Sequence, residues 1–166
     1  YNFMTNSYYL KKIELKKKNF LKIGRNCKIS NLVTFIGEKN ISIGSNVRID
    51  DFCIINGLEG FVVIGDDTHI NSFCYLLGAA GINIGKDCDI SQGVKIYSKS
   101  DDYKKIIKKR IYKKINISNN VIIGSNSILL PGATLGENSR IGALTIVNKI
   151  IKKNILFYGK IQKKLS

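Results

Sequence analysis

Large apolar residues, mostly branched aliphatic, recur every six positions along most of the chain. They stand at 123, 129, 135, 141 and 147, and groups of three with the same step begin at 23, 43, 64 and 84. An α-helix repeats about every 3.6 residues and a strand about every two, so neither gives this spacing. A long-range repeat of this kind indicates a solenoid, in which short units stack along one axis.

The six-residue units come in threes, with slips of two or three residues between the early groups. Three units predict one turn of a three-sided prism, with each apolar residue pointing inward and successive turns paired as parallel strands. Gly, Asn and Asp follow the apolar positions because corners need positive φ or local side-chain hydrogen bonds. The residue four positions after each apolar one is small or β-branched, as a narrow interior requires: Cys27, Val33, Val47, Cys53, Thr68, Cys74, Cys88, Val94, Val121, Ser127, Ala133, Ser139 and Thr145.

The pattern therefore predicts an all-β parallel β-helix with distinct ends. Loosely helical spacing of apolar residues before residue 20 favours a short helical cap over the open end of the coil, where strand edges would otherwise be exposed. The expected segments are a cap at 1–20, the β-helix at 21–150 with a loop at 101–116, and a basic tail at 151–166.

Charge and hydropathy narrow the range of partners. The 166 residues include 27 Lys plus Arg against 12 Asp plus Glu, a net charge of +15 that invites an anionic partner such as nucleic acid, a phosphoester cofactor or a membrane. Aromatic residues are not interleaved with the basic ones as a nucleic-acid platform needs, so no nucleic-acid partner is expected. Without an apolar run of about 18 residues or a signal-peptide core, we expect a cytoplasmic protein with no transmembrane segment.

The four cysteines, Cys27, Cys53, Cys74 and Cys88, all occupy the small inward position of the repeat. No CxxC pair is present, which disfavours a zinc knuckle. A cytoplasmic protein keeps its thiols reduced. We interpret the four side chains as buried small hydrophobes rather than as metal ligands or nucleophiles.

The repeated [IL]-G-x-[ND] units resemble those of the hexapeptide-repeat acyltransferases. The likeness is strongest in IGSNVRIDDFCI (43–54), GINIGKDCDISQGVKIYSKSDDY (81–103) and the stretch at 121–147. It points to sugar O-acetyltransferases of bacterial surface-polysaccharide pathways, often labelled galactoside-acetyltransferase-like. This resemblance implies a left-handed β-helix, a homotrimer, acetyl-CoA in a groove between neighbouring prisms, and a loop that covers the site. The break at 101–116 fits that loop.

The implied reaction is acetyl transfer from acetyl-CoA to a sugar hydroxyl, with no metal required. Such a transfer needs a general base, donors for the oxyanion and a groove that aligns the reactants. His69, the only histidine, lies beside a corner and is the candidate base. Where better-known galactoside and maltose acetyltransferases place a histidine, this chain has Asp101 or Asp102. We hypothesise that His69 of one subunit faces Asp101 or Asp102 of its neighbour, which would orient the imidazole.

The resemblance also suggests residues for the two substrates. Ser98, Ser100 and Tyr103, in the distinctive IYSKSDDY stretch, are predicted to contact the acceptor, and serine nucleophilic catalysis is disfavoured because direct transfer needs no acyl-enzyme. Small residues let the main chain approach a pantetheine arm, and lysines suit the CoA phosphates. The predicted cofactor-binding residues are Gly124, Gly142, Ala143, Lys149, Lys160 and Lys163.

Other functions remain open at this stage. An N-acetyltransferase acting on a nucleotide-linked amino sugar would use the same groove, and the sequence does not decide between a hydroxyl and an amine acceptor. A non-catalytic, anion-binding repeat scaffold or an inactive acyltransferase is also compatible with the pattern. A carbonic anhydrase on this coil needs three histidines around zinc, which one histidine per chain does not provide.

Overall fold

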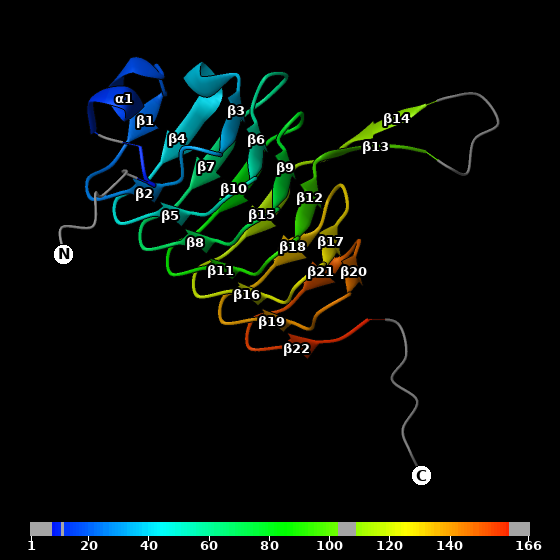
Figure 1. The fold of residues 1–166 in the computed structure, drawn as a ribbon. Coiled ribbons are helices and arrows are strands. Elements are labelled where there is room, and N and C mark those ends of the chain that lie inside the picture. The colour runs from blue at the N-terminus through cyan, green and yellow to red at the C-terminus, as the bar shows by residue number, and fades with distance from the viewer. Residues whose placement is uncertain (1–7, 11, 103–108, 160–166) are drawn as a thin grey trace, which may run out of the picture.

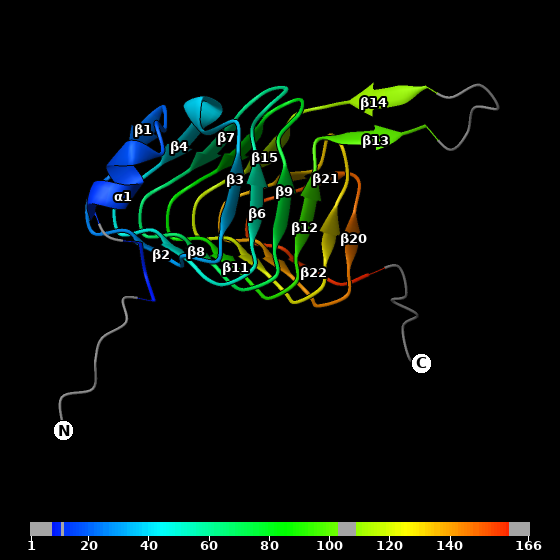
Figure 2. The same ribbon diagram turned by 45° about the horizontal axis from the view of Figure 1, so that its top comes forward.

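The computed structural model describes residues 8–10, 12–102 and 109–159. Within them, three parallel sheets form the faces of a prism (Figures 1 and 2). Face 1 contains β1 (Lys22–Ile23), β4 (Ile41–Ile43), β7 (Val62–Ile64), β10 (Ile82–Ile84), β15 (Ile115–Ile117), β18 (Thr134–Leu135) and β21 (Ile150–Ile151). Face 2 contains β2 (Lys28–Ile29), β5 (Arg48–Ile49), β8 (His69–Ile70), β11 (Asp89–Ile90), β16 (Ile122–Ile123), β19 (Arg140–Ile141) and β22 (Leu156–Phe157). Face 3 contains β3 (Thr34–Ile36), β6 (Ile54–Asn56), β9 (Tyr75–Leu77), β12 (Lys95–Tyr97), β17 (Ile128–Leu129) and β20 (Ile146–Val147).

Each turn of the chain crosses the three faces in order, and turns are numbered here as coils 1 to 6 from the N-terminus. The register stacks equivalent residues, so that Ile49, Ile70 and Ile90 lie in one column on face 2. These inward side chains are fully buried. The predicted parallel prism and its aliphatic interior are confirmed.

The corners between faces 1 and 2 are formed by Asn or Asp in the left-handed region. Their φ values lie between 51° and 58° in coils 1 to 6, as at Asn46 and Asp87. Side-chain amides also bridge the coils: Asn46 Nδ2 donates to Asp67 Oδ1 at 2.8 Å, and Asn120 Nδ2 to Asn138 Oδ1 at 2.8 Å. The predicted use of these residue types at corners is therefore confirmed, because they tolerate positive φ and can bond locally.

The two ends of the prism differ. Helix α1 (Lys12–Lys17) lies beside coil 1, and its Leu15 is buried in the common core. At the other end we expected the β-helix to stop at residue 150, but β21 and β22 continue it to Phe157. The step from Val147 to Ile151 is four residues instead of six, which hides this last partial turn, and Phe157 resumes the six-residue step.

A hairpin interrupts the prism between faces 3 and 1. Its antiparallel strands are β13 (Lys99–Asp101) and β14 (Arg110–Tyr112), and it projects away from the prism at the position of the predicted loop (Figure 2). Lys99 Nζ contacts Glu59 Oε2 at 2.6 Å, and the amide of Lys113 donates to the carbonyl of Ser98 at 2.9 Å. These contacts fix the base of the hairpin. A 3-10 turn, η1 (Glu38–Asn40), lies between coils 1 and 2.

In the part of the chain that the structure describes, no helix has both the length and the hydrophobicity needed to cross a bilayer.

Candidate active site

Six polar side chains form a continuous patch on the outer surface of face 2. In each of β5, β8 and β11 a buried isoleucine is flanked by two residues, which alternation directs outward. Because the three strands are adjacent and in register, these flanking residues form two rows of three. The polar patch consists of Arg48, Asp50, His69, Asn71, Asp89 and Ser91.

Asp50 holds two cationic or titratable partners at once. Its Oδ2 is 2.7 Å from His69 Nε2 and its Oδ1 is 2.7 Å from Arg48 Nε. Only 11% of the Asp50 side chain is exposed, whereas 31% of His69 is. The hydrogen bond from Arg48 to Asp50 raises the pKa of the guanidinium further. Asp50 therefore fixes the orientation of His69 from within the same chain.

This contact assigns the two nitrogens of His69 to different roles. A carboxylate accepts, so Nε2 carries the proton that it shares with Asp50. The other nitrogen, Nδ1, has no hydrogen-bond partner among the described residues. In the neutral imidazole Nδ1 keeps its lone pair and is available to accept a proton from a substrate.

Sequence reasoning missed Asp50, although a signal for it exists. The position directly after the inward isoleucine on face 2 is glycine in coils 5 and 6, at Gly124 and Gly142. In coils 1 to 4 the same position is polar, as Ser30, Asp50, Asn71 and Ser91. The presence of polar residues at this position in coils 1 to 4, in place of glycine, indicates that this part of face 2 has a function in addition to the stacking of coils.

Asp101 and Asp102 lie far from this patch within one chain. They belong to the hairpin, which leaves the prism at the corner opposite face 2. Asp101 is the register partner of Arg110 in the hairpin, and both line a cavity of about 580 Å³ together with Lys109 and Tyr112. Since Asp50 occupies Nε2 of His69, a carboxylate from a neighbouring subunit would have to meet Nδ1. Contact between His69 and Asp101 or Asp102 across subunits stays a prediction.

Ser98 does not face the acceptor side as we predicted. It is fully buried, its Oγ donates to the carbonyl of Leu77 at 2.8 Å, and the amide of Ala80 donates to Oγ at 2.8 Å. These bonds make it a structural residue of the corner beneath the hairpin. Ser100 lies on β13, and its Oγ is 3.2 Å from the carbonyl oxygen of Asp101. Tyr103 lies outside the described residues.

A groove of about 590 Å³ at the C-terminal end of the prism is lined in part by two of the predicted cofactor-binding residues, whose role stays a prediction. Its lining includes Ala143 and Lys149, beside Leu144, Ile146 and Phe157. The lysine ammonium lies 4.5 Å from the centre of the Phe157 ring. Apolar walls with one cation suit a pantetheine arm and a phosphate, so the donor set fits CoA. Lys160 and Lys163 lie outside the described residues.

Gly124 and Gly142 are small for a reason that requires no cofactor. A Cβ on Gly124 would lie 2.5 Å from the amide nitrogen of Ala143 in the next coil. A Cβ on Gly142 would collide with the ring of Tyr158. Local packing, against the backbone of the next coil at Gly124 and against the Tyr158 ring at Gly142, therefore accounts for the small residue at both positions, and a role in CoA binding stays a prediction.

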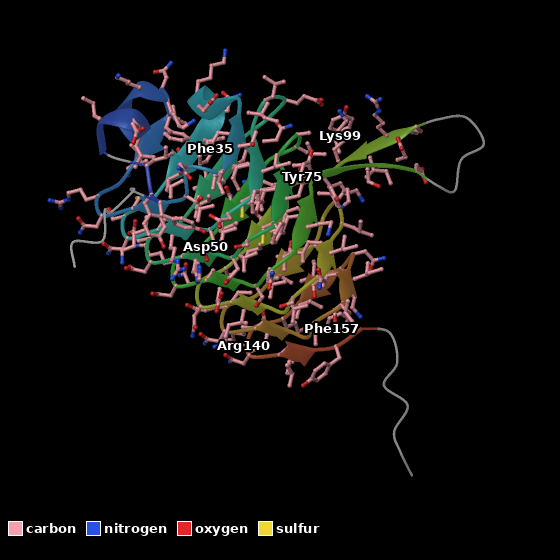
Figure 3. The ribbon with its side chains drawn as sticks, viewed as in Figure 1. Phe35, Asp50, Tyr75, Lys99, Arg140 and Phe157 are labelled. Atoms are coloured by element: carbon pink, nitrogen blue, oxygen red, sulfur yellow. The ribbon has the colours of Figure 1, made fainter. Side chains whose placement is uncertain are left out.

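Figure 3 shows how these regions lie relative to one another. Asp50 and Arg140 are on the same side of the prism, along face 2. Lys99 marks the base of the hairpin on another side, and Phe157 lies at the C-terminal end. His69 in coil 3 therefore lies several coils away from the groove around Lys149 along the axis of the prism.

The fold is a three-sided β-solenoid of hexapeptide repeats, and one face carries a histidine–carboxylate pair. Comparison with known proteins identifies the family that has this fold. The model "Bacterial transferase hexapeptide (six repeats)" matches residues 114–149, and "Hexapeptide repeat of succinyl-transferase" matches residues 61–98. The chain is 39% identical over 151 residues to the dTDP-4-amino-4,6-dideoxy-D-glucose acyltransferase of Escherichia coli, covering 85% of this chain and 79% of the relative. The chain belongs to the hexapeptide-repeat acyltransferase family.

Two further similarities bear on the type of acceptor. A galactoside O-acetyltransferase of Lactococcus lactis is 29% identical over 152 residues, which cover 89% of this chain and 63% of that protein. A crystal structure of a serine-to-cysteine variant of AntD, an N-acyltransferase from Bacillus cereus, contains dTDP-4-amino-4,6-dideoxyglucose and coenzyme A. It superposes with a TM-score of 0.88 at 32% identity, covering 94% of this chain and 88% of AntD.

Proposed function

We infer that the protein transfers an acyl group from an acyl-CoA to the amino group of a nucleotide-linked amino sugar. The observation that carries this inference is the similarity, over most of both chains, to the E. coli dTDP-amino-sugar acyltransferase and to AntD. Both are more similar to this chain than the galactoside O-acetyltransferase of L. lactis is. The amine acceptor, which was the alternative from the sequence, thus replaces the sugar hydroxyl as the leading interpretation.

An acceptor that binds as an ammonium loses two protons. The first leaves to solvent and frees the nitrogen lone pair, and the second leaves as the amide forms and is balanced by the proton that the CoA sulfur takes up. The amine nitrogen forms a bond to the acyl carbon, the carbon–sulfur bond breaks, and the departing sulfur ends as the thiol of CoA. His69 Nδ1 is the candidate to take the amine proton, while Asp50 holds the ring through Nε2. Lys149 and the apolar walls around it are the candidates to hold the donor.

A second pair of residues is supported by the variants of AntD that have been crystallised. They replace one serine or one aspartate, and these two positions are ten residues apart. Ser91 and Asp101 are the one serine–aspartate pair with that spacing in the 166-residue sequence. Ser91 belongs to the polar patch, and Asp101 is exposed on the hairpin. An exposed carboxylate suits an ammonium acceptor better than a neutral hydroxyl, because it attracts the positive charge.

The test is an assay of acyl transfer with two acceptors, dTDP-4-amino-4,6-dideoxyglucose and a simple galactoside, using acetyl-CoA and 3-hydroxybutyryl-CoA as donors. Mass spectrometry should detect an N-acylated nucleotide sugar and no acylated galactoside. We expect His69→Gln to lower kcat about 100-fold or more, as the loss of a general base does. Asp87→Asn is the control, because asparagine occupies equivalent corners in coils 1 and 2. Preference for the galactoside would contradict the proposed function.

A further inference from the structure

Two positive side chains lie next to one another on face 2, on the N-terminal side of His69. Lys28 and Arg48 are register partners in β2 and β5, and Arg48 and His69 are register partners in β5 and β8. All three precede a buried isoleucine, so they point outward in one row. Like charges opposite each other on adjacent strands are unfavourable unless an anion lies between them.

The positive charge of this row is only partly neutralised within the chain. Among the described residues Arg48 forms one ion pair, with Asp50, and the Tyr9 hydroxyl adds an electrostatic interaction, whereas Lys28 forms no ion pair. Both side chains reach solvent, and 49% of the Arg48 side chain is exposed. The row therefore offers an accessible pair of cations beside the candidate base.

The two terminal amino groups of the Arg48 guanidinium are free to bind a ligand. The contact with Asp50 engages Nε, and the two terminal amino groups make no hydrogen bond to described residues. Asp50 is largely buried and also binds His69, so it fixes the position of the arginine relative to that ring. A guanidinium with two free amino groups in a fixed position is suited to bidentate recognition of a phosphate.

The position of this row also agrees with the order of groups in the substrate. In a nucleotide-linked sugar the diphosphate is attached close to the sugar that carries the amine. Neighbouring strands are about 4.8 Å apart, so Arg48 lies within a sugar's length of His69. The groove around Lys149 is on the other side of His69 along the prism, at coils 6 and beyond.

We propose that Arg48 and Lys28 bind the diphosphate of the nucleotide-linked acceptor, with Arg48 held in place by the same carboxylate that orients His69. This proposal rests on the proposed function. It places the acceptor on the N-terminal coils and the donor at the C-terminal end, so that the two substrates approach His69 from opposite directions.

Calorimetric titration with dTDP tests this subsite without requiring catalysis. We expect Arg48→Gln to weaken dTDP binding about 10- to 100-fold, as the loss of a charge-assisted contact does, and Lys28→Gln about 3- to 10-fold. Inorganic pyrophosphate should compete with dTDP in the unchanged protein and much less in Arg48→Gln. Affinity for CoA should stay the same in both variants.

Arg140→Gln is the matched control, because Arg140 has the same position in the repeat on face 2 but lies in coil 6. Its dTDP affinity should stay within about twofold of the unchanged protein. Arg48→Lys keeps the positive charge but lacks the planar guanidinium that binds two phosphate oxygens at once. An affinity for dTDP between those of the unchanged protein and Arg48→Gln is therefore expected. In the acyl-transfer assay, Arg48→Gln should raise the KM for the acceptor far more than it lowers kcat. If Arg48 only held Asp50 and His69 in position, the same substitution would instead lower kcat.

Unchanged dTDP affinity in folded Arg48→Gln and Lys28→Gln would overturn the proposal. So would equal losses in Arg48→Gln and Arg140→Gln. If the unchanged protein acylates a nucleotide-linked amino sugar while these variants bind dTDP normally, the subsite is wrong and the proposed function stands. If the unchanged protein binds CoA but neither binds dTDP nor acylates a nucleotide sugar, the proposed function fails as well.

Discussion

Single residues at the corners between faces 2 and 3 adopt backbone conformations that bulky side chains avoid. Phe52 and Phe73 have φ of 58° and 63°, and Leu144 has 55°. The two rings stack with centroids 5.2 Å apart, yet about half of each side chain is exposed. A bulky residue at positive φ costs on the order of 1 kcal/mol. Corner geometry is thus imposed by the prism as a whole, even where the residue does not favour it.

The buried cysteines allow a residue-scale test of the interior. Burial raises the pKa of the Cys88 thiol, and contact with Cys53 together with burial raises the pKa of Cys74. A raised pKa leaves less of the reactive thiolate at a given pH. Burial raises the pKa of the Cys27 thiol as well, so access to the sulfur decides the order. We expect iodoacetamide at pH 8.5 to label half-buried Cys27 first, and Cys74 and Cys88 only after denaturation. Peptide mass spectrometry measures this, and equal labelling of the three thiols in the folded protein would contradict the buried interior.

At the scale of elements, an ion pair between Lys99 and Glu59 lies at the base of the hairpin. The Lys99 ammonium lowers the pKa of Glu59, and Glu59 in turn raises the pKa of Lys99. The stabilisation from Glu59 is complete above the pKa of an unfolded glutamate, about 4.3, and is lost as the pH falls through the lowered value of the folded state. The stabilisation from Lys99 is complete below about 10.4 and is lost as the pH rises through its raised pKa.

The hairpin should therefore loosen when this pair is removed at neutral pH. We expect Glu59→Gln to accelerate hydrogen exchange several-fold at the amides of β13 and β14, and to leave the strands of coils 2 and 3 unaffected. Hydrogen–deuterium exchange with peptide resolution measures this. Glu137→Gln is the control, because Glu137 is exposed and forms no ion pair among the described residues. Equal acceleration in both variants would show that the pair does not anchor the hairpin.

At the scale of the whole molecule, the sequence predicts the prism far better than the site. The burial of Ile49 and Ile70 can be predicted because the six-residue step is a local pattern. The place of each isoleucine in its own six-residue unit is enough to indicate that it points inward. The contact of Asp50 with His69 spans 19 residues and depends on the slip between coils, which no local pattern gives. The prediction that Ser98 contacts the acceptor was wrong. The IYSKSDDY stretch passes from the buried corner to the hairpin, and its sequence does not indicate the residue at which the chain leaves the prism.

The hairpin and the polar patch lie on different sides of one chain, so a site that uses both must be shared between copies. We expect His69→Gln and Asp101→Asn each to be nearly inactive as pure proteins. In a closed homo-oligomer, an interface combines an intact His69 with an intact Asp101 from the next chain in about a quarter of cases when the two variants assemble randomly in equal amounts.

Co-expression of the two variants, with different affinity tags and purification through both, removes oligomers of a single variant. In a trimer each remaining oligomer has one restored interface out of three, so about a third of the activity per chain should be recovered. The matched control is co-expression of His69→Gln with Asp50→Asn. These two residues bond within one chain, so no mixed interface restores that pair. Recovery in the first mixture and not in the second would assign His69 and Asp101 to one shared site. If neither mixture recovers activity, His69 and Asp101 do not act together across an interface.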